Sequence, residues 1–103
     1  MSYKLTLNIQ DIKEYIGTYK LLALDIETSP LSSFRDDEKA SLDAHKSSIT
    51  GISFSVEKGT GIYVPFNHKV GRNADFVGTF NWIKNNILLN KNLTVFILVL
   101  FAY

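Results

Sequence analysis

The sequence predicts an α/β fold in which a single domain, residues 1–103, is built around a mixed β-sheet. Three observations support this class. There are apolar runs typical of buried strands, two alternating stretches joined by a turn, and two segments with apolar residues at helical spacing. A chain of 103 residues is long enough for one small domain with a modest core. The expected order is helix, central strand, hairpin, helix, and a strand parallel to an earlier one.

The first predicted elements are a short helix and the strand that follows it. In residues 8–17, three isoleucines recur at helical spacing. Asn8 is a favourable N-cap residue for this helix, and Gly17 is suited to end it. Residues 21–24, with the sequence LLAL, are apolar on both faces of an extended chain. This pattern predicts a central strand that is covered on both sides.

A β-hairpin is predicted in the middle of the chain. Residues 49–56 and 61–66 alternate apolar and polar side chains, and the turn-forming sequence EKGTG joins them. Pro65 cannot donate to a β-ladder, so either the second arm lies at a sheet edge or Pro65 lies at the end of its strand. The polar segment 29–48 before the hairpin carries a capping-box pattern at residues 33–36, which predicts a short surface helix.

A second helix and a last strand complete the predicted fold. The helix is expected to begin near Asp75 and to continue for about four turns, because apolar residues recur at i, i+4, i+7 and i+11 from Phe76. The apolar run 93–103 is much shorter than the roughly 20 residues that span a bilayer. It is predicted to be a buried strand, connected through the helix and parallel to an earlier strand.

The composition excludes several functional classes. Eleven Lys and Arg against ten Asp and Glu give a formal net charge of +1, so long-range attraction to phosphate or to an anionic membrane is not expected. Cysteine is absent, which excludes disulfides, thiolate nucleophiles and cysteine zinc sites, and which fits a reducing compartment. The amino terminus lacks the apolar stretch of a signal peptide. A cytoplasmic location without membrane contact is therefore expected.

The candidate functional residues are two carboxylates at the end of the predicted central strand, Asp25 and Glu27. Residues two apart in a strand point to the same face and lie roughly 6 to 7 Å apart. Two such charges repel by about 2 kcal/mol at an effective dielectric of about 20, and burial adds a desolvation cost. A Lys or Arg, a proton or a divalent ion would compensate, and carboxylate oxygens suit Mg²⁺ or Mn²⁺. The simpler alternative is a strand that ends in two solvated acids.

Three segments together resemble a known family. The sequence LLALDIETSPL at residues 21–31 is followed by ITGISFS at 49–55 and by GIYVPFNH at 61–68. In this order they resemble the 3′ to 5′ exonuclease (proofreading) domain of family A, bacterial DNA polymerase I-like enzymes. This domain is a branch of the ribonuclease H-like DEDD exonucleases. The resemblance implies a ribonuclease H-like mixed sheet.

The resemblance also implies roles for individual residues. Asp25 matches the aspartate that bridges two metal ions, and Glu27 matches the glutamate that holds one ion and orients the attacking water. Thr28 and Leu31 match positions near the 3′-terminal nucleotide, where the leucine packs against the bases. The implied activity is hydrolysis of phosphodiester bonds at single-stranded DNA 3′ ends, with Mg²⁺ or Mn²⁺ as cofactor.

The later motifs of the family are not found in this sequence. Family members have a strand that ends in Asn with Asp four residues later, but the corresponding run 94–103, TVFILVLFAY, contains neither. The third motif, Tyr with Asp four residues later, is also absent. The resemblance thus covers the amino-terminal half of the domain, where Asp25 and Glu27 alone would hold at most one weakly bound ion. The expected partners are a DNA 3′ end, and either the missing carboxyl half or a polymerase domain.

Two other functions stay open at this point. The chain can be a non-catalytic fragment that associates with a chain supplying the missing half, which the apolar run 93–103 favours. It can also be a nucleic-acid binding remnant, although the near-neutral charge argues against strong binding. His68 is a weaker candidate for catalysis, and Tyr63 and Trp82 for base stacking. Packing or structural roles are expected for all three.

Overall fold

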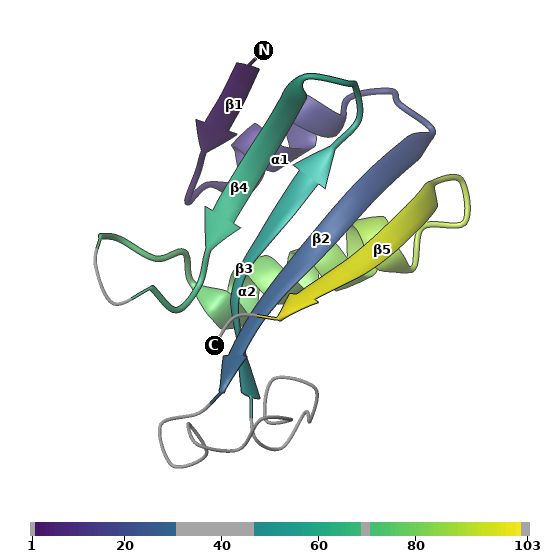
Figure 1. The fold of residues 1–103 in the computed structure, drawn as a ribbon. Helices are drawn as coiled ribbons and strands as arrows, with labels where there is room; N and C mark the ends of the chain where they lie inside the picture. The colour runs from purple at the N-terminus through teal and green to yellow at the C-terminus, as the bar shows by residue number, and fades with distance from the viewer. Residues whose placement is uncertain (1, 31–46, 69–70, 102–103) are drawn as a thin grey trace.

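The computed structural model describes residues 2–30, 47–68 and 71–101. Their elements are β1 (Ser2–Leu5), α1 (Ile9–Ile16), β2 (Leu21–Pro30), β3 (Ser47–Ser55), β4 (Thr60–Pro65), α2 (Phe76–Ile83), the π-helical turn η3 (Lys84–Leu88) and β5 (Thr94–Phe101). The strands form one sheet in the order β1-β4-β3-β2-β5 (Figure 1). β3 is antiparallel to β2 and β4, whereas β1 is parallel to β4 and β5 to β2. The predicted α/β class with a mixed sheet is therefore confirmed.

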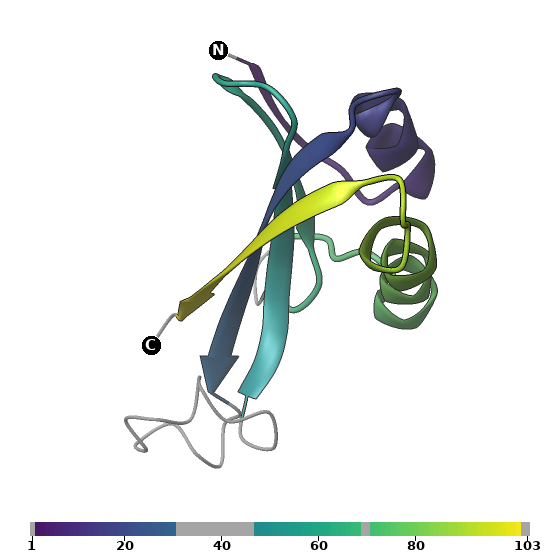
Figure 2. The ribbon, with the colours of Figure 1, turned by 90° about the vertical axis from the view of Figure 1, so that its right-hand side faces the viewer.

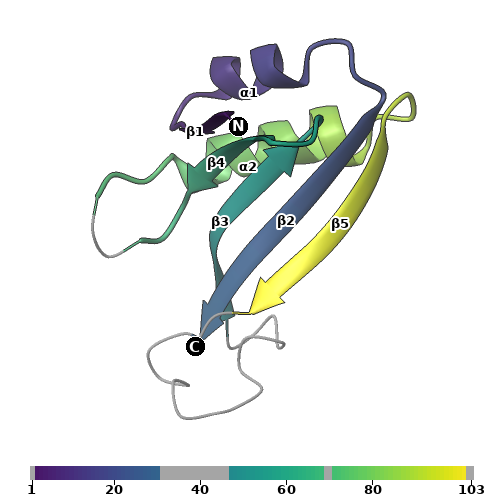
Figure 3. The same cartoon turned by 45° about the horizontal axis from the view of Figure 1, so that its top comes forward.

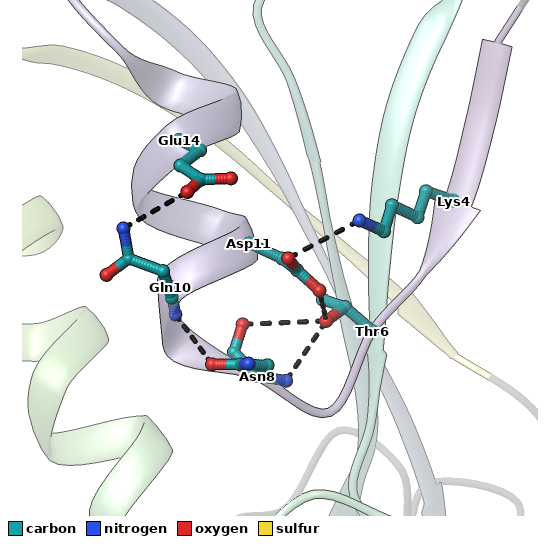
Figure 4. Close-up of polar contacts among 6 residues, drawn as sticks. All are labelled: Lys4, Thr6, Asn8, Gln10, Asp11 and Glu14. Carbon is teal, nitrogen blue, oxygen red and sulfur yellow. Dashed lines mark hydrogen bonds and ion pairs between the residues drawn. The ribbon is translucent and has the colours of Figure 1, made fainter.

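The helix α1 has the ends that its sequence predicts. The backbone N–H of Gln10 donates a hydrogen bond of 2.9 Å to the side chain of Asn8, the N-cap residue (Figure 4). Gly17 ends the helix with φ 52°, a backbone conformation that glycine adopts without a Cβ clash. Ile12 and Ile16 are buried beneath the helix. Local sequence chemistry is sufficient to explain both ends.

Asp11 connects this helix to β1 (Figure 4). Its carboxylate accepts a hydrogen bond from the Thr6 hydroxyl and forms an ion pair with Lys4 at 3.4 Å. The Thr6 hydroxyl, with a smaller contribution from Lys4, lowers the pKa of Asp11 below its usual value. The sequence does not predict β1, because four residues are too few to show a period. The strand forms through its parallel pairing with β4.

The hairpin and the second helix agree with the predictions. β3 and β4 pair antiparallel, and Pro65 is the last residue of β4, so its missing N–H falls at the strand end. The backbone N–H of Gly78 donates to the Asp75 side chain, which caps α2 at the expected start of the helix. The last turn of the predicted helix is η3, a π-helical turn. The surface helix expected at residues 33–36 lies outside the described residues.

Both helices lie on the same face of the sheet, as Figure 2 shows, and Figure 3 gives a view from above. The core lies between these helices and the sheet. It consists of Ile12, Ile16, Leu22, Leu24, Ile52, Phe54, Ile62, Val64, Phe66, Ala74, Ile83 and Ile87. We call the opposite side of the sheet the open face, because no helix of the described residues covers it.

The prediction that residues 21–24 form a central, doubly covered strand is wrong. β3 is the middle strand, and β2 lies between β3 and the edge strand β5. Leu22 and Leu24 are buried, whereas Leu21 and Ala23 are exposed on the open face. Since all four residues are apolar, the sequence shows no alternation from which the uncovered face could be recognised.

The last strand is parallel to an earlier one, as predicted, but the side chains described in it are not buried. β5 pairs with β2. Phe96, Ile97 and Leu98 are 63%, 53% and 56% exposed. Within the described residues β5 has a neighbour on one side only, which explains this exposure. No helix in the described part of the chain has the length and apolar character needed to cross a bilayer.

Candidate metal-binding site

Asp25 and Glu27 lie on the open face of the sheet. In the register of β2 and β3, Asp25 pairs with Ser53 and Glu27 pairs with Gly51. The irregularity in this ladder comes after Glu27, so the alternation of side chains is unbroken between the two acids. Both acids are half-buried. β2 therefore presents two carboxylates on the side of the sheet away from the helices.

No basic side chain of the described residues neutralises this pair. The ion pair found in this part of the chain joins Lys4 to Asp11, and no Lys or Arg nitrogen of the described residues lies within 4.0 Å of Asp25 or Glu27. A Lys or Arg of the described residues is therefore excluded as the group that compensates the repulsion between the two carboxylates. The same ranges contain no group of three or more His, Cys, Asp or Glu side chains that could hold a metal ion.

Glu27 lies beside a β-bulge in β3. Glu27 pairs with Gly51 and Thr28 pairs with Ile49, so Thr50 is an extra residue on β3. The hydroxyl of Thr50 donates to the carbonyl oxygen of Glu27 at 3.1 Å and lies 3.4 Å from its Oε1 atom. A hydroxyl has one proton, so these two acceptors share it. The sequence carries no signal for this role of Thr50, because a bulge is defined by pairing between strands.

The ring of Tyr63 lies over Gly51, the register partner of Glu27. A Cβ atom on Gly51 would overlap the hydroxyl and Cζ of Tyr63 and would come within 2.8 Å of its Cε1 atom. The ring of Tyr63 therefore occupies the space that a side chain at position 51 would fill. Its hydroxyl is 2.6 Å from Nε2 of His68, and the two rings meet edge to face. The sequence signal for this contact is a glycine within a strand.

Asp25 borders a hollow in the open face. The hollow has a volume of about 440 Å³, which is within the range of small-molecule sites. Its lining includes small residues of the inner strands together with two tyrosine rings and the carboxylate, among them Tyr3, Ala23, Asp25, Ser53, Gly61 and Tyr63. A ligand that enters this hollow can therefore reach Asp25.

The two residues predicted to contact nucleic acid are placed differently. Thr28 directly follows the irregularity in the β2–β3 ladder and is 8% exposed, so little of its side chain is available to a ligand. Leu31 lies outside the described residues. Trp82 is half-buried and packs against the core, as expected for an aromatic residue on an amphipathic helix.

Comparison with known proteins adds no family assignment. No protein-family model matches the chain, and no curated protein matches it.

The charge of Glu27 affects the pKa of the Tyr63 phenol. Burial raises the pKa of Tyr63 above its usual value, and the negative charge of Glu27 raises it further. We expect Glu27→Gln to lower this pKa only partly, because burial remains. The measurement is an NMR titration of tyrosine ¹³Cζ signals between about pH 8 and 12. Since the folded state disfavours the phenolate, the stability that Tyr63 contributes is complete below the pKa of the unfolded chain and is lost as the pH rises through the folded value.

A second tyrosine provides the control for this titration. The pKa of Tyr19 is raised first by the hydrogen bond of 3.1 Å that its hydroxyl donates to Glu57. Glu57→Gln should lower the pKa of Tyr19 and leave that of Tyr63 unchanged. An unchanged pKa of Tyr63 in Glu27→Gln would show that the Glu27 carboxylate does not lie beside the phenol.

Proposed function

We propose that Asp25 and Glu27 are two of the metal ligands of a 3′ to 5′ exonuclease site. This site hydrolyses phosphodiester bonds at single-stranded DNA 3′ ends. The observation that carries the proposal is the pair of carboxylates on the open face without a Lys or Arg partner in the described residues. The resemblance of three segments to the exonuclease domain of DNA polymerase I-like enzymes supports the reaction class. The mixed sheet with its hairpin supports a ribonuclease H-like fold.

The donor set fits part of a Mg²⁺ or Mn²⁺ site. Carboxylate oxygens are the ligands these ions prefer, but the described residues offer two acids and no third His, Cys, Asp or Glu beside them. In this proposal the remaining ligands come from residues outside the described ranges or from another chain. We therefore expect this chain alone to hold one ion weakly and no more, and to degrade DNA weakly or not at all. A cytoplasmic location is part of the proposal, and the absence of cysteine fits it.

The chain's own residues have distinct tasks in such a site. Divalent ions, when bound, stabilise the attacking and leaving oxygens of the phosphoryl group. Asp25, at the border of the hollow, binds the cations. Glu27, whose Oε1 lies beside the Thr50 hydroxyl, binds one cation and orients the attacking water. No helix of the described residues covers the face on which both carboxylates lie.

The test of this proposal is Mn²⁺ binding by the folded chain. Paramagnetic Mn²⁺ should broaden the backbone NMR signals of Asp25, Glu27 and their partner Ser53 before those of the helices. We expect Asp25→Asn to raise the Mn²⁺ dissociation constant at least about tenfold, because even the loss of groups that only support a metal ligand has this effect. A 3′-labelled single-stranded DNA should be incubated in parallel to measure degradation.

The matched control for this experiment is Glu14→Gln. Glu14 is an exposed acid on α1, on the opposite side of the sheet, so its replacement should leave Mn²⁺ broadening unchanged. Broadening of β2 that is equally strong in Asp25→Asn would contradict the proposal. DNA degradation that persists in Asp25→Asn would have to come from another site.

Exposed apolar side chains favour a second candidate function. Leu5, Leu21, Phe96 and Leu98 are all more than half exposed, and their strand positions place them on the open face. These side chains suit association with a chain that supplies the missing half of the domain. The Mn²⁺ experiment separates the two candidates, because association does not require this chain to bind a cation by itself.

A further inference from the structure

We infer that the β-bulge at Thr50 holds the Glu27 carboxylate in place, which makes Thr50 a positioning residue of the proposed metal site. The consequence for cation affinity rests on the proposed function. The claim that the Glu27 side chain is fixed is geometric and does not rest on the proposed function. β-Bulges occur next to active sites, where they redirect a side chain.

The bulge brings the Thr50 hydroxyl to the carboxylate. In a regular strand, a residue next to Gly51 would point away from the open face, because successive side chains alternate. With Thr50 as an extra residue, its Oγ1 instead lies 3.1 Å from the carbonyl oxygen and 3.4 Å from Oε1 of Glu27. Thr50 is buried, so water competes little for this hydroxyl. The backbone and the side chain of Glu27 are thus held by one group.

The bulge is itself fixed by the chain that leaves β4. The carbonyl oxygen of Thr50 accepts hydrogen bonds from the backbone N–H groups of Phe66 at 2.9 Å and Asn67 at 3.2 Å. Phe66 is buried in the core. Thr50 therefore cannot move without breaking two backbone hydrogen bonds, which makes it a rigid support for the Glu27 side chain.

Asp25 and Glu27 differ in how firmly their side chains are held. Oε1 of Glu27 lies 3.4 Å from the Thr50 hydroxyl, and the register partner of Glu27, Gly51, lies beneath the Tyr63 ring. Asp25 accepts no hydrogen bond from a side chain of the described residues and borders the hollow. The structure thus has one acid that is oriented before a ligand binds and one that can adjust to it. Preorientation removes part of the entropic cost of binding.

The experiment compares Thr50→Val, which keeps the shape and removes the hydroxyl, with Thr50→Ser, which keeps the hydroxyl. The first readout is the side-chain rotamer of Glu27, measured by NMR scalar couplings without any metal. We expect one staggered rotamer in the wild type and in Thr50→Ser, and averaged couplings in Thr50→Val. The second readout is the Mn²⁺ dissociation constant, which should rise about tenfold in Thr50→Val and recover in Thr50→Ser.

A matched control removes a buried threonine hydroxyl elsewhere. Thr79, buried in α2, is replaced by Val, and the Glu27 rotamer should not change. Averaged couplings in the wild type, a single rotamer in Thr50→Val, or averaging in Thr50→Ser or Thr79→Val would each overturn the inference. If Mn²⁺ does not bind the wild type, the proposed function fails, but the rotamer comparison still decides whether the bulge positions Glu27.

Discussion

Replacement of Phe54 by alanine is expected to destabilise the fold by about 3–5 kcal/mol, the largest effect that we predict for a single substitution. Phe54 lies on the middle strand β3, is 1% exposed, and belongs to the core between the sheet and the helices. Because small domains are stable by only about 5–15 kcal/mol, this loss should leave a substantial fraction of the chain unfolded on mild heating. Urea unfolding followed by circular dichroism measures the change.

The control for this prediction is Phe96→Ala. Phe96 has the same side chain but lies on the edge strand β5 and is 63% exposed. Its replacement should cost less than about 1 kcal/mol, because substitutions of exposed residues are usually near neutral. Equal losses from the two substitutions would contradict the placement of β5 at an exposed edge of the sheet.

Gly51→Ala is expected to destabilise the fold by about 1–3 kcal/mol, because a methyl group would overlap the Tyr63 ring. Positive φ angles among the described glycines occur at Gly17, Gly59 and Gly71, so backbone strain is not the reason at position 51. The new methyl group should also displace the Tyr63 hydroxyl from His68. Urea unfolding gives the free energy, and the ring signals of Tyr63 show its displacement.

A double-mutant cycle with Tyr63→Ala isolates this overlap. Without the aromatic ring, Gly51→Ala should be neutral or slightly stabilising, since alanine restricts the unfolded chain more than glycine does. We therefore expect a coupling energy between the two positions of more than about 1 kcal/mol. Additive effects would mean that Tyr63 does not lie over Gly51 in solution.

The predictions that succeeded depend on chemistry between near neighbours in the chain. Asn8, Gly17 and Asp75 cap their helices because side chains and backbone groups a few residues apart satisfy one another. The hairpin follows from two alternating stretches around a short turn. The parallel pairing of β5 follows from the helix that connects it to the hairpin.

Only part of the candidate site could be predicted from the sequence. The two-residue period of a strand places Asp25 and Glu27 on one face, whatever their neighbours are. The groups around Glu27 could not be predicted. Thr50 approaches it through a bulge that exists only in the register between strands, and the Tyr63 ring of β4 covers its register partner Gly51. Gly51 was the available signal, since a glycine inside a strand often marks a bulge or a close approach.

The sequence by itself determined where α1 begins and ends, where α2 begins, that the hairpin forms, and that two acids share one face of a strand. Only the tertiary structure decided that, among the described residues, β3 is the middle strand, β5 is an exposed edge, and no helix covers one side of the sheet. The physical reason is that an all-apolar strand has no alternation, so its sequence is equally compatible with one covered face or two. Burial in such a strand depends on which elements pack against it.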